Sequence, residues 1–222
     1  MEKRAIDRVV DAVVFDYGGV LTTPVRDAMG GWLMADGITE DSYRAVMREW
    51  LVGDAATGSP VHRLETGALS PADFERALAP RLTTASGAPV VAEGLLGRMF
   101  ALMRPDPAML ALVGALRSVG LRTALLSNSW GDHYTDDLLA LFDTVVISGR
   151  VGLRKPDPAV FTLLLDTLDL PGRRVAFVDD IPVNVRGAEE LGIRAVLHTD
   201  AQTTTAALRR LVPDLPELDV TA

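Results

Sequence analysis

The sequence has no cysteine, only three histidines and no long apolar run. A chain without cysteine forms neither disulfides nor thiolate metal sites, which fits a reducing cytoplasm. No stretch reaches the roughly 18 apolar residues of a membrane span, and the charged segment from Met1 to Asp11 lacks the apolar region of a signal peptide. We therefore expect a cytoplasmic protein with no membrane partner.

Basic residues are scarce as well, because 22 Lys and Arg stand against 30 Asp and Glu and the formal net charge is -8. They occur in short pairs such as Arg154-Lys155 and Arg173-Arg174, not in longer runs. Binding to a nucleic-acid backbone needs a concentrated basic face, so we expect no nucleic-acid partner. Nucleotide-binding glycine motifs, the G-x-S-x-G elbow and the H-E-x-x-H metal motif are also absent.

The chain has 222 residues and 48% hydrophobic content, which suits one large domain or a domain that carries an insertion. Near its start the apolar run Ala12 to Phe15 has the length of a buried strand and stops at Asp16, which Gly18 and Gly19 follow. The pattern predicts a carboxylate at the carboxyl end of a strand, where open parallel sheets bind ligands. A plain tight turn is the alternative.

Helical patterns without strand signals fill the next part of the chain. We expect helices over 39–52, 71–79 and 90–103, separated by loop signals at Gly30-Gly31 and Thr57–Pro60. Ser70-Pro71 has the cap and the first-turn proline of a helix start. The sequence therefore predicts a helical insertion over 25–104, with the core of the protein in 1–24 and 105–222.

After Pro105 helices and short apolar strands alternate. Helix starts are expected at Asp106-Pro107, Asp136, Asp157-Pro158 and Val183, and strands over 123–126, 144–147, 174–178 and 194–197. Such alternation implies parallel strands joined by right-handed helical crossovers, so the fold class is α/β with a doubly wound parallel sheet. The tail from Pro213 to Ala222 is expected to be loosely held.

Polar residues stand at several of these strand ends: Asp16, Ser127-Asn128 and Asp179-Asp180, with Lys155 in a glycine-rich loop over 149–156. Three carboxylates about 4 Å apart repel by roughly 4 kcal/mol per pair, so they need a cation to stay ionised. Ligands that are all oxygen favour Mg²⁺. Lys155 and Ser127 would serve phosphoryl oxygens. Taken singly, Ser127 and Asp179-Asp180 are also typical helix caps, and Lys155 a solvated loop lysine.

At this point the residues resemble the haloacid dehalogenase (HAD) superfamily of hydrolases, in the branch that contains the phosphatase domain of soluble epoxide hydrolase. The motifs that carry the resemblance are Phe15–Leu21, Leu126-Ser127-Asn128, Lys155-Pro156 and Phe177–Asp180, in that order. The resemblance covers nearly the whole chain. It implies a Rossmann-like core with a helical cap domain inserted after the first strand.

The resemblance also implies a mechanism. Asp16 would attack a phosphate monoester and form an aspartyl-phosphate, which water then hydrolyses. Mg²⁺ would be held by Asp16, the Gly18 carbonyl oxygen and Asp180, with Asp179 reaching it directly or through water. Ser127, Lys155 and, as a weaker candidate, Asn128 would hold the phosphoryl oxygens.

One position departs from the family pattern. The residue two after the nucleophile is usually a second aspartate, the general acid and base, and here it is Gly18. Loss of such help typically lowers a rate by about 10²- to 10⁴-fold. His133 is a candidate substitute, with an ordinary surface histidine as the alternative.

The sequence thus predicts a Mg²⁺-dependent phosphatase for a small phosphorylated metabolite, as a monomer or homodimer. The alternatives are a metal-independent 2-haloacid dehalogenase and a weakened binding or regulatory protein. The insertion should select the substrate. Its Trp32 and Trp50 are expected in the insertion's core rather than against substrate, and His62 and His198 as caps or surface residues rather than ligands.

Overall fold

The computed structural model describes residues 8–218 except 52–57 and 132. Its sheet has five parallel strands in the order β3-β2-β1-β4-β5. The strands are β1 Ala12–Phe15, β2 Arg122–Ser127, β3 Thr144–Ile147, β4 Val175–Asp179 and β5 Arg194–Leu197. The predicted doubly wound parallel sheet is confirmed, and each predicted strand lies within a residue of its observed bounds.

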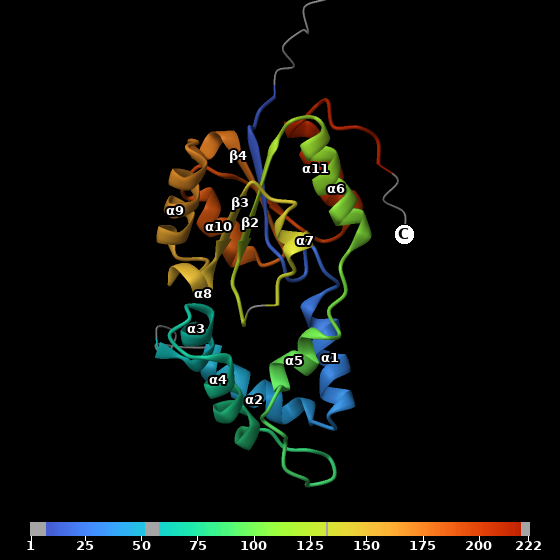
Figure 1. Ribbon diagram of the computed structural model, residues 1–222, viewed down its shortest axis with the longest axis vertical. Coiled ribbons are helices and arrows are strands. Elements are labelled where there is room, and N and C mark those ends of the chain that lie inside the picture. Colours follow the sequence, from blue (N-terminus) through green and yellow to red (C-terminus); the bar gives the residue numbers. More distant parts are fainter. Residues whose placement is uncertain (1–7, 52–57, 132, 219–222) are drawn as a thin grey trace, which may run out of the picture.

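Helices cover both faces of this sheet (Figure 1). The first face packs on α6 Pro107–Ser118 and α11 Ala201–Leu211 through a cluster that includes Leu112 and Leu208. The second packs on α9 Pro158–Leu168 and α10 Pro182–Glu189 through a cluster around Phe161 and Ala188. Alternate residues of β1 enter the two clusters, which explains why this strand is apolar throughout.

Strand register brings the predicted site residues to one edge. Phe15 at the end of β1 pairs with Leu125 of β2 and Val178 of β4. Asp16, Ser127 and Asp179 therefore follow at the same carboxyl edge. Since the chain runs from β1 outward to β2 and β3 and then returns to β4, this edge is the switch point where doubly wound sheets bind ligands.

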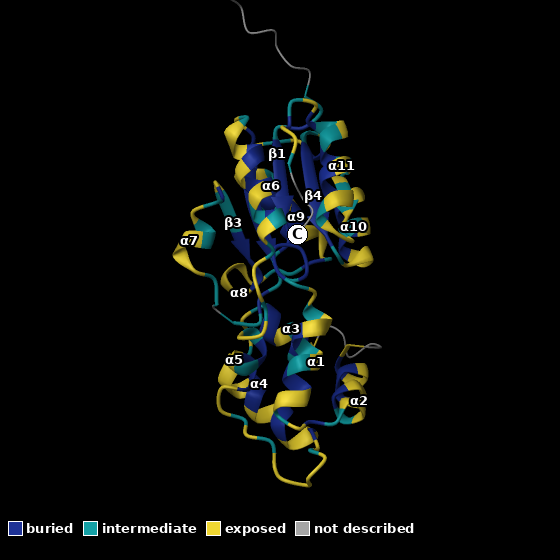
Figure 2. Cartoon of the chain, turned by 90° about the vertical axis from the view of Figure 1, so that its right-hand side faces the viewer, coloured by how far each residue is buried: buried dark blue, intermediate teal, exposed yellow. Residues whose placement is uncertain are grey.

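A second group of helices lies between β1 and β2 in the sequence and forms the lower body in Figures 1 and 2. It comprises α1 Val25–Ala35, α2 Glu40–Leu51, α3 Pro60–Glu65, α4 Pro71–Leu78, the 3-10 turn η2 Ala79–Arg81 and α5 Leu95–Phe100. These helices share an apolar cluster of their own, which buries Trp32 and Trp50 as expected. The division into a core and an inserted cap domain with boundaries at 25 and 104 stays a prediction.

Several local predictions were wrong. Gly30-Gly31 lies inside α1 rather than in a loop, because a Cβ on Gly31 would approach Leu102 Cδ1 to 3.2 Å and the small residue permits this close packing. The helix predicted over 90–103 shortens to α5, since Gly94 has a left-handed φ of 68° and breaks it. The stretch 149–156 begins in a helical turn, α8 Ser148–Val151.

The chain beyond α11 is also better held than predicted. Leu215 is buried in the core cluster, and Asp214 forms an ion pair with Arg8. The rest of the predicted loose tail, 219–222, lies outside the described residues. The helix predicted from Asp136 is a single turn, α7 Asp136–Leu139. Within the described ranges, no helix combines the length and apolar character needed to cross a membrane.

Candidate active site

Asp16 follows β1 directly, and its backbone N–H donates to the Val178 carbonyl at 2.9 Å, so the strand pairing fixes its place. The residue is 7% exposed. Burial raises the pKa of its carboxyl group to about 7, although the positive charge of Lys155 acts in the opposite direction. The site thus presents a nearly enclosed carboxylate that requires a positive partner to stay ionised.

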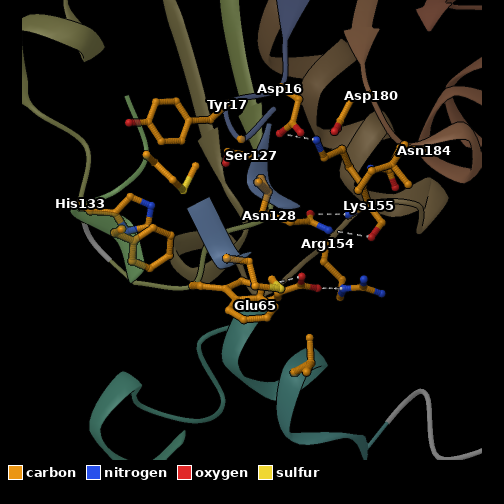
Figure 3. A pocket seen from close by; sticks show the side chains of 18 of the residues that line it. Asp16, Tyr17, Glu65, Ser127, Asn128, His133, Arg154, Lys155, Asp180 and Asn184 are labelled. Atoms are coloured by element: carbon orange, nitrogen blue, oxygen red, sulfur yellow. Dashed lines mark hydrogen bonds and ion pairs between the residues drawn. The ribbon is translucent and has the colours of Figure 1, made fainter. Parts of the chain in front are cut away.

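Lys155 is that partner. Its Nζ lies 2.7 Å from Asp16 Oδ1 and 2.6 Å from Asp179 Oδ2, and the residue is 1% exposed. Burial lowers the pKa of the amine, but the charges of Asp16 and Asp179 outweigh it, so the net shift is upward. The interpretation of Lys155 as a solvated loop lysine is therefore wrong. Asn128 fixes the lysine's backbone, because its amide donates to the Lys155 carbonyl at 3.0 Å and accepts the Lys155 N–H at 2.9 Å (Figure 3).

Asp179 is fully buried and both of its oxygens are engaged. Oδ1 accepts the Ile181 N–H at 2.8 Å, and Asn184 Nδ2 donates to Oδ1 and Oδ2 at 3.1 Å each. Together with the Lys155 contact, these bonds orient the lysine toward Asp16. Asn184, in the first turn of α10, was not identified from the sequence.

Asp180 differs from its neighbour. Its Oδ1 is buried without a hydrogen-bond partner among the described residues. Burial and the charge of Asp179 raise its pKa to about 6. Oxygens of Asp16, Asp179 and Asp180 lie within 4.8 Å of one another. An orphaned carboxylate oxygen within such an all-oxygen group fits a hard divalent cation such as Mg²⁺.

The glycines after Asp16 shape this space. Gly19 has a φ of 80°, and a Cβ there would lie 2.5 Å from Asp180 Oδ2, so only glycine leaves room for the Asp180 carboxylate. At Gly18 a Cβ would instead meet Val25 Cγ2 at 3.1 Å and Met103 Cε at 3.6 Å. The ligand role of the Gly18 carbonyl oxygen stays a prediction.

Ser127 is the last residue of β2, not a helix cap, and is 2% exposed. Tyr134 donates its hydroxyl hydrogen to Ser127 Oγ at 2.8 Å. Burial raises the pKa of this tyrosine to about 12, so it stays protonated. Because Oγ already accepts from the tyrosine, the serine's own hydrogen is available to an acceptor in the site. Tyr134 was also not identified from the sequence.

A cavity of about 340 Å³ opens from these groups toward the helices of residues 25–104 (Figure 3). Asp16, Ser127, Lys155 and Asp180 line its polar end. Apart from Glu65 of α3, the side chains that α1, α3, α5 and the segment after α5 contribute to its wall are apolar: Val25, Met29, Val61, Met99, Phe100 and Met103. His133 lines the cavity with its ring stacked on Phe100, 3.7 Å between centroids. Its role as a proton donor stays a hypothesis. His62 and His198 do not line this cavity.

One polar cluster joins the two halves of the structure beside the cavity. Glu65 of α3 accepts hydrogen bonds from Trp130 Nε1 at 2.9 Å and from Arg154 Nε. Its backbone carbonyl accepts from the Ser148 hydroxyl. The Arg154 guanidinium, next to Lys155 in the chain, is thus neutralised by a carboxylate from the helical insertion. No sequence pattern indicated this pairing, because the partners are 89 residues apart.

Comparisons with known proteins agree with this arrangement. The profile of the haloacid dehalogenase-like hydrolases matches residues 10–192. The bifunctional epoxide hydrolase 2 of Sus scrofa is 31% identical over 112 residues, covering 46% of this chain and 20% of that protein. The chain thus spans about a fifth of the length of this relative.

Two other similarities extend over most of the chain. The sesquiterpene phosphatase astK of Aspergillus oryzae is 27% identical over 211 residues, 90% of this chain and 96% of that protein. A HAD family enzyme from Bacteroides thetaiotaomicron, solved in complex with magnesium and inorganic phosphate, matches with a TM-score of 0.63 and 18% identity. That match covers 86% of this chain and 94% of the other, and at this identity it shows the fold alone.

Proposed function

The chain belongs to the haloacid dehalogenase-like hydrolases, and we propose that it is a Mg²⁺-dependent phosphatase that hydrolyses a small phosphate monoester through Asp16. The observation that carries the proposal is the placement of Asp16. Its carboxylate contacts Lys155 in a buried site, beside the unpaired oxygen of Asp180 and at the polar end of a cavity.

In the proposed reaction an oxygen of Asp16 attacks phosphorus and the bond from phosphorus to the ester oxygen breaks. The ester oxygen leaves with the electron pair of the broken bond and takes a proton from water, and an aspartyl-phosphate remains on Asp16. Water then attacks the phosphorus, which releases inorganic phosphate and returns the carboxylate. Lys155 and the Ser127 hydroxyl would hold the phosphoryl oxygens, and Lys155 also reduces the repulsion between the carboxylate and the dianionic substrate.

Mg²⁺ would be held by Asp16, the Gly18 carbonyl oxygen and Asp180, where it would neutralise charge on the phosphoryl group. For Asp179 the sequence expectation was contact with Mg²⁺ directly or through water, and of these two we propose contact through water. Its oxygens are already engaged by Lys155, Asn184 and the Ile181 N–H, so it would orient the lysine.

The similar proteins support this proposal. The chain matches almost the full length of a protein described as a sesquiterpene phosphatase, and its fold is shared by an enzyme crystallised with magnesium and phosphate. A small phosphorylated molecule is the corresponding partner for this chain. Whether the protein acts as a monomer or a homodimer stays a prediction.

The test is release of inorganic phosphate from a panel of phosphate esters with Mg²⁺. We expect turnover that is lost on chelation and in Asp16→Asn, which keeps the size of the side chain and removes the nucleophile. Because Asp16 is itself a proposed Mg²⁺ ligand, circular dichroism and urea unfolding of the Asp16→Asn protein check that its fold is kept. No release from any ester, an activated aryl phosphate included, would contradict the proposal.

The same panel separates the alternatives. Halide release from a 2-haloacid that persists in EDTA would identify a dehalogenase. Binding of Mg²⁺ and phosphate without turnover of any ester would identify a binding or regulatory protein. The unpaired Asp180 oxygen favours the phosphatase, because a metal-independent reaction has no use for it.

A further inference from the structure

The position two residues after the nucleophile, Gly18, contains no acid, and hydrocarbon side chains fill the space beside it. Gly18 has no side chain, and the direction of its missing Cβ leads to Val25 Cγ2 at 3.1 Å and to Met103 Cε at 3.6 Å. Both side chains line the cavity. Leaving aside the chain neighbours Tyr17 and Gly19, no polar atom of the described residues lies within 4 Å of that Cβ position, so a leaving ester oxygen meets no donor there.

Two of the other donors at the polar end already have acceptors, and the Tyr17 hydroxyl points away from Asp16 (Figure 3). The Tyr134 hydroxyl donates to Ser127, and Lys155 Nζ lies between the carboxylates of Asp16 and Asp179. The Glu65 side chain forms an ion pair with Arg154 and accepts a hydrogen bond from Trp130. The histidine that lines the cavity, His133, packs flat on Phe100.

The end of the cavity opposite Asp16 is apolar, and this limits which substrates fit there. Its wall is formed by aliphatic, methionine and aromatic side chains such as Met29, Val61, Met99 and Phe100. Arg154 also lines the cavity, but its guanidinium is already paired with Glu65. A substrate with a second anionic group would lack a cation to compensate it there, whereas an apolar ring would replace water from apolar walls.

We propose that the substrates are aryl phosphates, the phosphate esters of phenols. This rests on the proposed phosphatase function and specifies its substrate class. A phenolate stabilises negative charge in its ring and leaves phosphorus without prior protonation. In the first step Asp16 forms the new bond to phosphorus, and the phenolate departs with the electron pair of the broken bond. It takes its proton from water after it has left.

The proposal predicts how rates depend on the leaving group. Phosphorylation of Asp16 should be fast for an acidic phenol and slow for an alcohol, and kcat/KM reports this step. Hydrolysis of the aspartyl-phosphate is the same for every ester, and it proceeds without a general base at position 18. For activated esters we expect one equivalent of phenolate in a burst, followed by a slower and common kcat.

The experiment compares para-nitrophenyl phosphate with para-nitrobenzyl phosphate, which are similar in size and polarity but release a phenolate and an alkoxide. We expect kcat/KM to be more than about 10²-fold higher for the nitrophenyl ester, in the range that general acid catalysis otherwise supplies. Gly18→Asp with Val25→Ala introduces the missing acid and makes room for it. This variant should reduce the ratio of the two esters by at least about 10-fold. Gly18→Asn with Val25→Ala introduces a side chain of the same shape that has no acidic proton, and it should leave the ratio unchanged.

The outcomes are separable. Equal kcat/KM for the two esters in the wild-type protein would overturn this inference and leave the phosphatase proposal standing. The inference would also be overturned by a small ratio of kcat/KM for the nitrophenyl ester to that for the nitrobenzyl ester, if this ratio rises in His133→Gln. The imidazole would then be the missing acid. No release from either ester, with no burst, would contradict the proposed function itself. The wild-type ratio needs no variant, so the test does not depend on whether the substituted proteins fold.

Discussion

Replacement of Lys155 by methionine is the most informative perturbation of the site, because this 1% exposed lysine holds two buried carboxylates. Without it, carboxylate oxygens of three acids, Asp16, Asp179 and Asp180, would lie within 4.8 Å of one another with no lysine charge to offset their repulsion. Carboxylates at that distance repel by about 3 kcal/mol per pair at an effective dielectric constant of about 20. Removing one member of a buried ion pair typically costs about 3–5 kcal/mol.

We therefore expect Lys155→Met to lower the free energy of unfolding by about 3–5 kcal/mol at pH 8 in EDTA. In a chain of this length about 1 kcal/mol moves the melting temperature by roughly 2–4 °C, so the expected decrease is roughly 6–20 °C. Urea unfolding followed by circular dichroism measures the energy directly. Added Mg²⁺ should stabilise the variant more than the wild-type protein, because the unscreened acids bind the cation more strongly.

The matched control is Lys155→Met combined with Asp16→Asn, which removes one of the opposed charges. It should recover part of the lost stability, and the difference between the single and double variants measures the coupling. A loss below about 1 kcal/mol for Lys155→Met in EDTA would refute the reasoning, since a cost that small is typical of exposed pairs.

Neighbouring groups give three more expected outcomes. Gly19→Ala should weaken Mg²⁺ binding about 10-fold or more in calorimetric titration, because the new Cβ displaces the Asp180 carboxylate. In EDTA, the raised pKa of about 7 at Asp16 means that the folded state keeps a proton which the unfolded state releases near pH 4. The free energy of unfolding of the wild-type protein minus that of Asp16→Asn should therefore fall as the pH rises from about 4 to 7. Urea titrations of both proteins measure this difference. Glu65→Gln leaves the Arg154 guanidinium unpaired and should destabilise the protein by about 1–3 kcal/mol in urea.

Each of these has a control within the chain. Gly120 has a φ of 81°, and a Cβ at this position would meet no other described side chain or backbone within 4 Å, so Gly120→Ala adds the same backbone strain without touching the site. Equal loss of Mg²⁺ affinity in both variants would contradict the role of Gly19. A stability difference that rises with pH would reverse the sign expected for Asp16. Glu40→Gln breaks an exposed ion pair with Arg44. If it lowers the free energy of unfolding as much as Glu65→Gln does, the cluster around Glu65 makes no special contribution to stability.

Much of the core was predictable because its physical signals are local. Apolar runs that stop at polar residues located all five strands, and Asp-Pro caps located α6 and α9. The helix α11 was missed because three consecutive threonines have low helix propensity, yet Asp200 caps it and Leu208 buries it in the core. The helix α1 was missed because two glycines in its middle are typical of a loop.

The site residues also separate into those that local sequence signals predict and those that they do not. Asp16, Ser127 and Asp179 stand at strand ends, so a parallel sheet brings them together without further information. Asn184 and Glu65 act through contacts that form only when distant segments pack, and one carboxylate or amide among many has no distinguishing pattern. The apolar wall beside Gly18 was likewise outside the reach of spacing, since Val25 and Met103 approach it from two separate segments.

The central claim is that Asp16 forms the covalent intermediate, and acid quenching of the burst phase tests it most directly. Protein mixed with para-nitrophenyl phosphate and Mg²⁺ is quenched, reduced with borohydride and mapped by mass spectrometry. We predict that the aspartyl-phosphate is reduced to homoserine at position 16, and that Asp16→Asn yields none. Phosphate release at a full rate with an unmodified Asp16, or trapping at another residue, would contradict it.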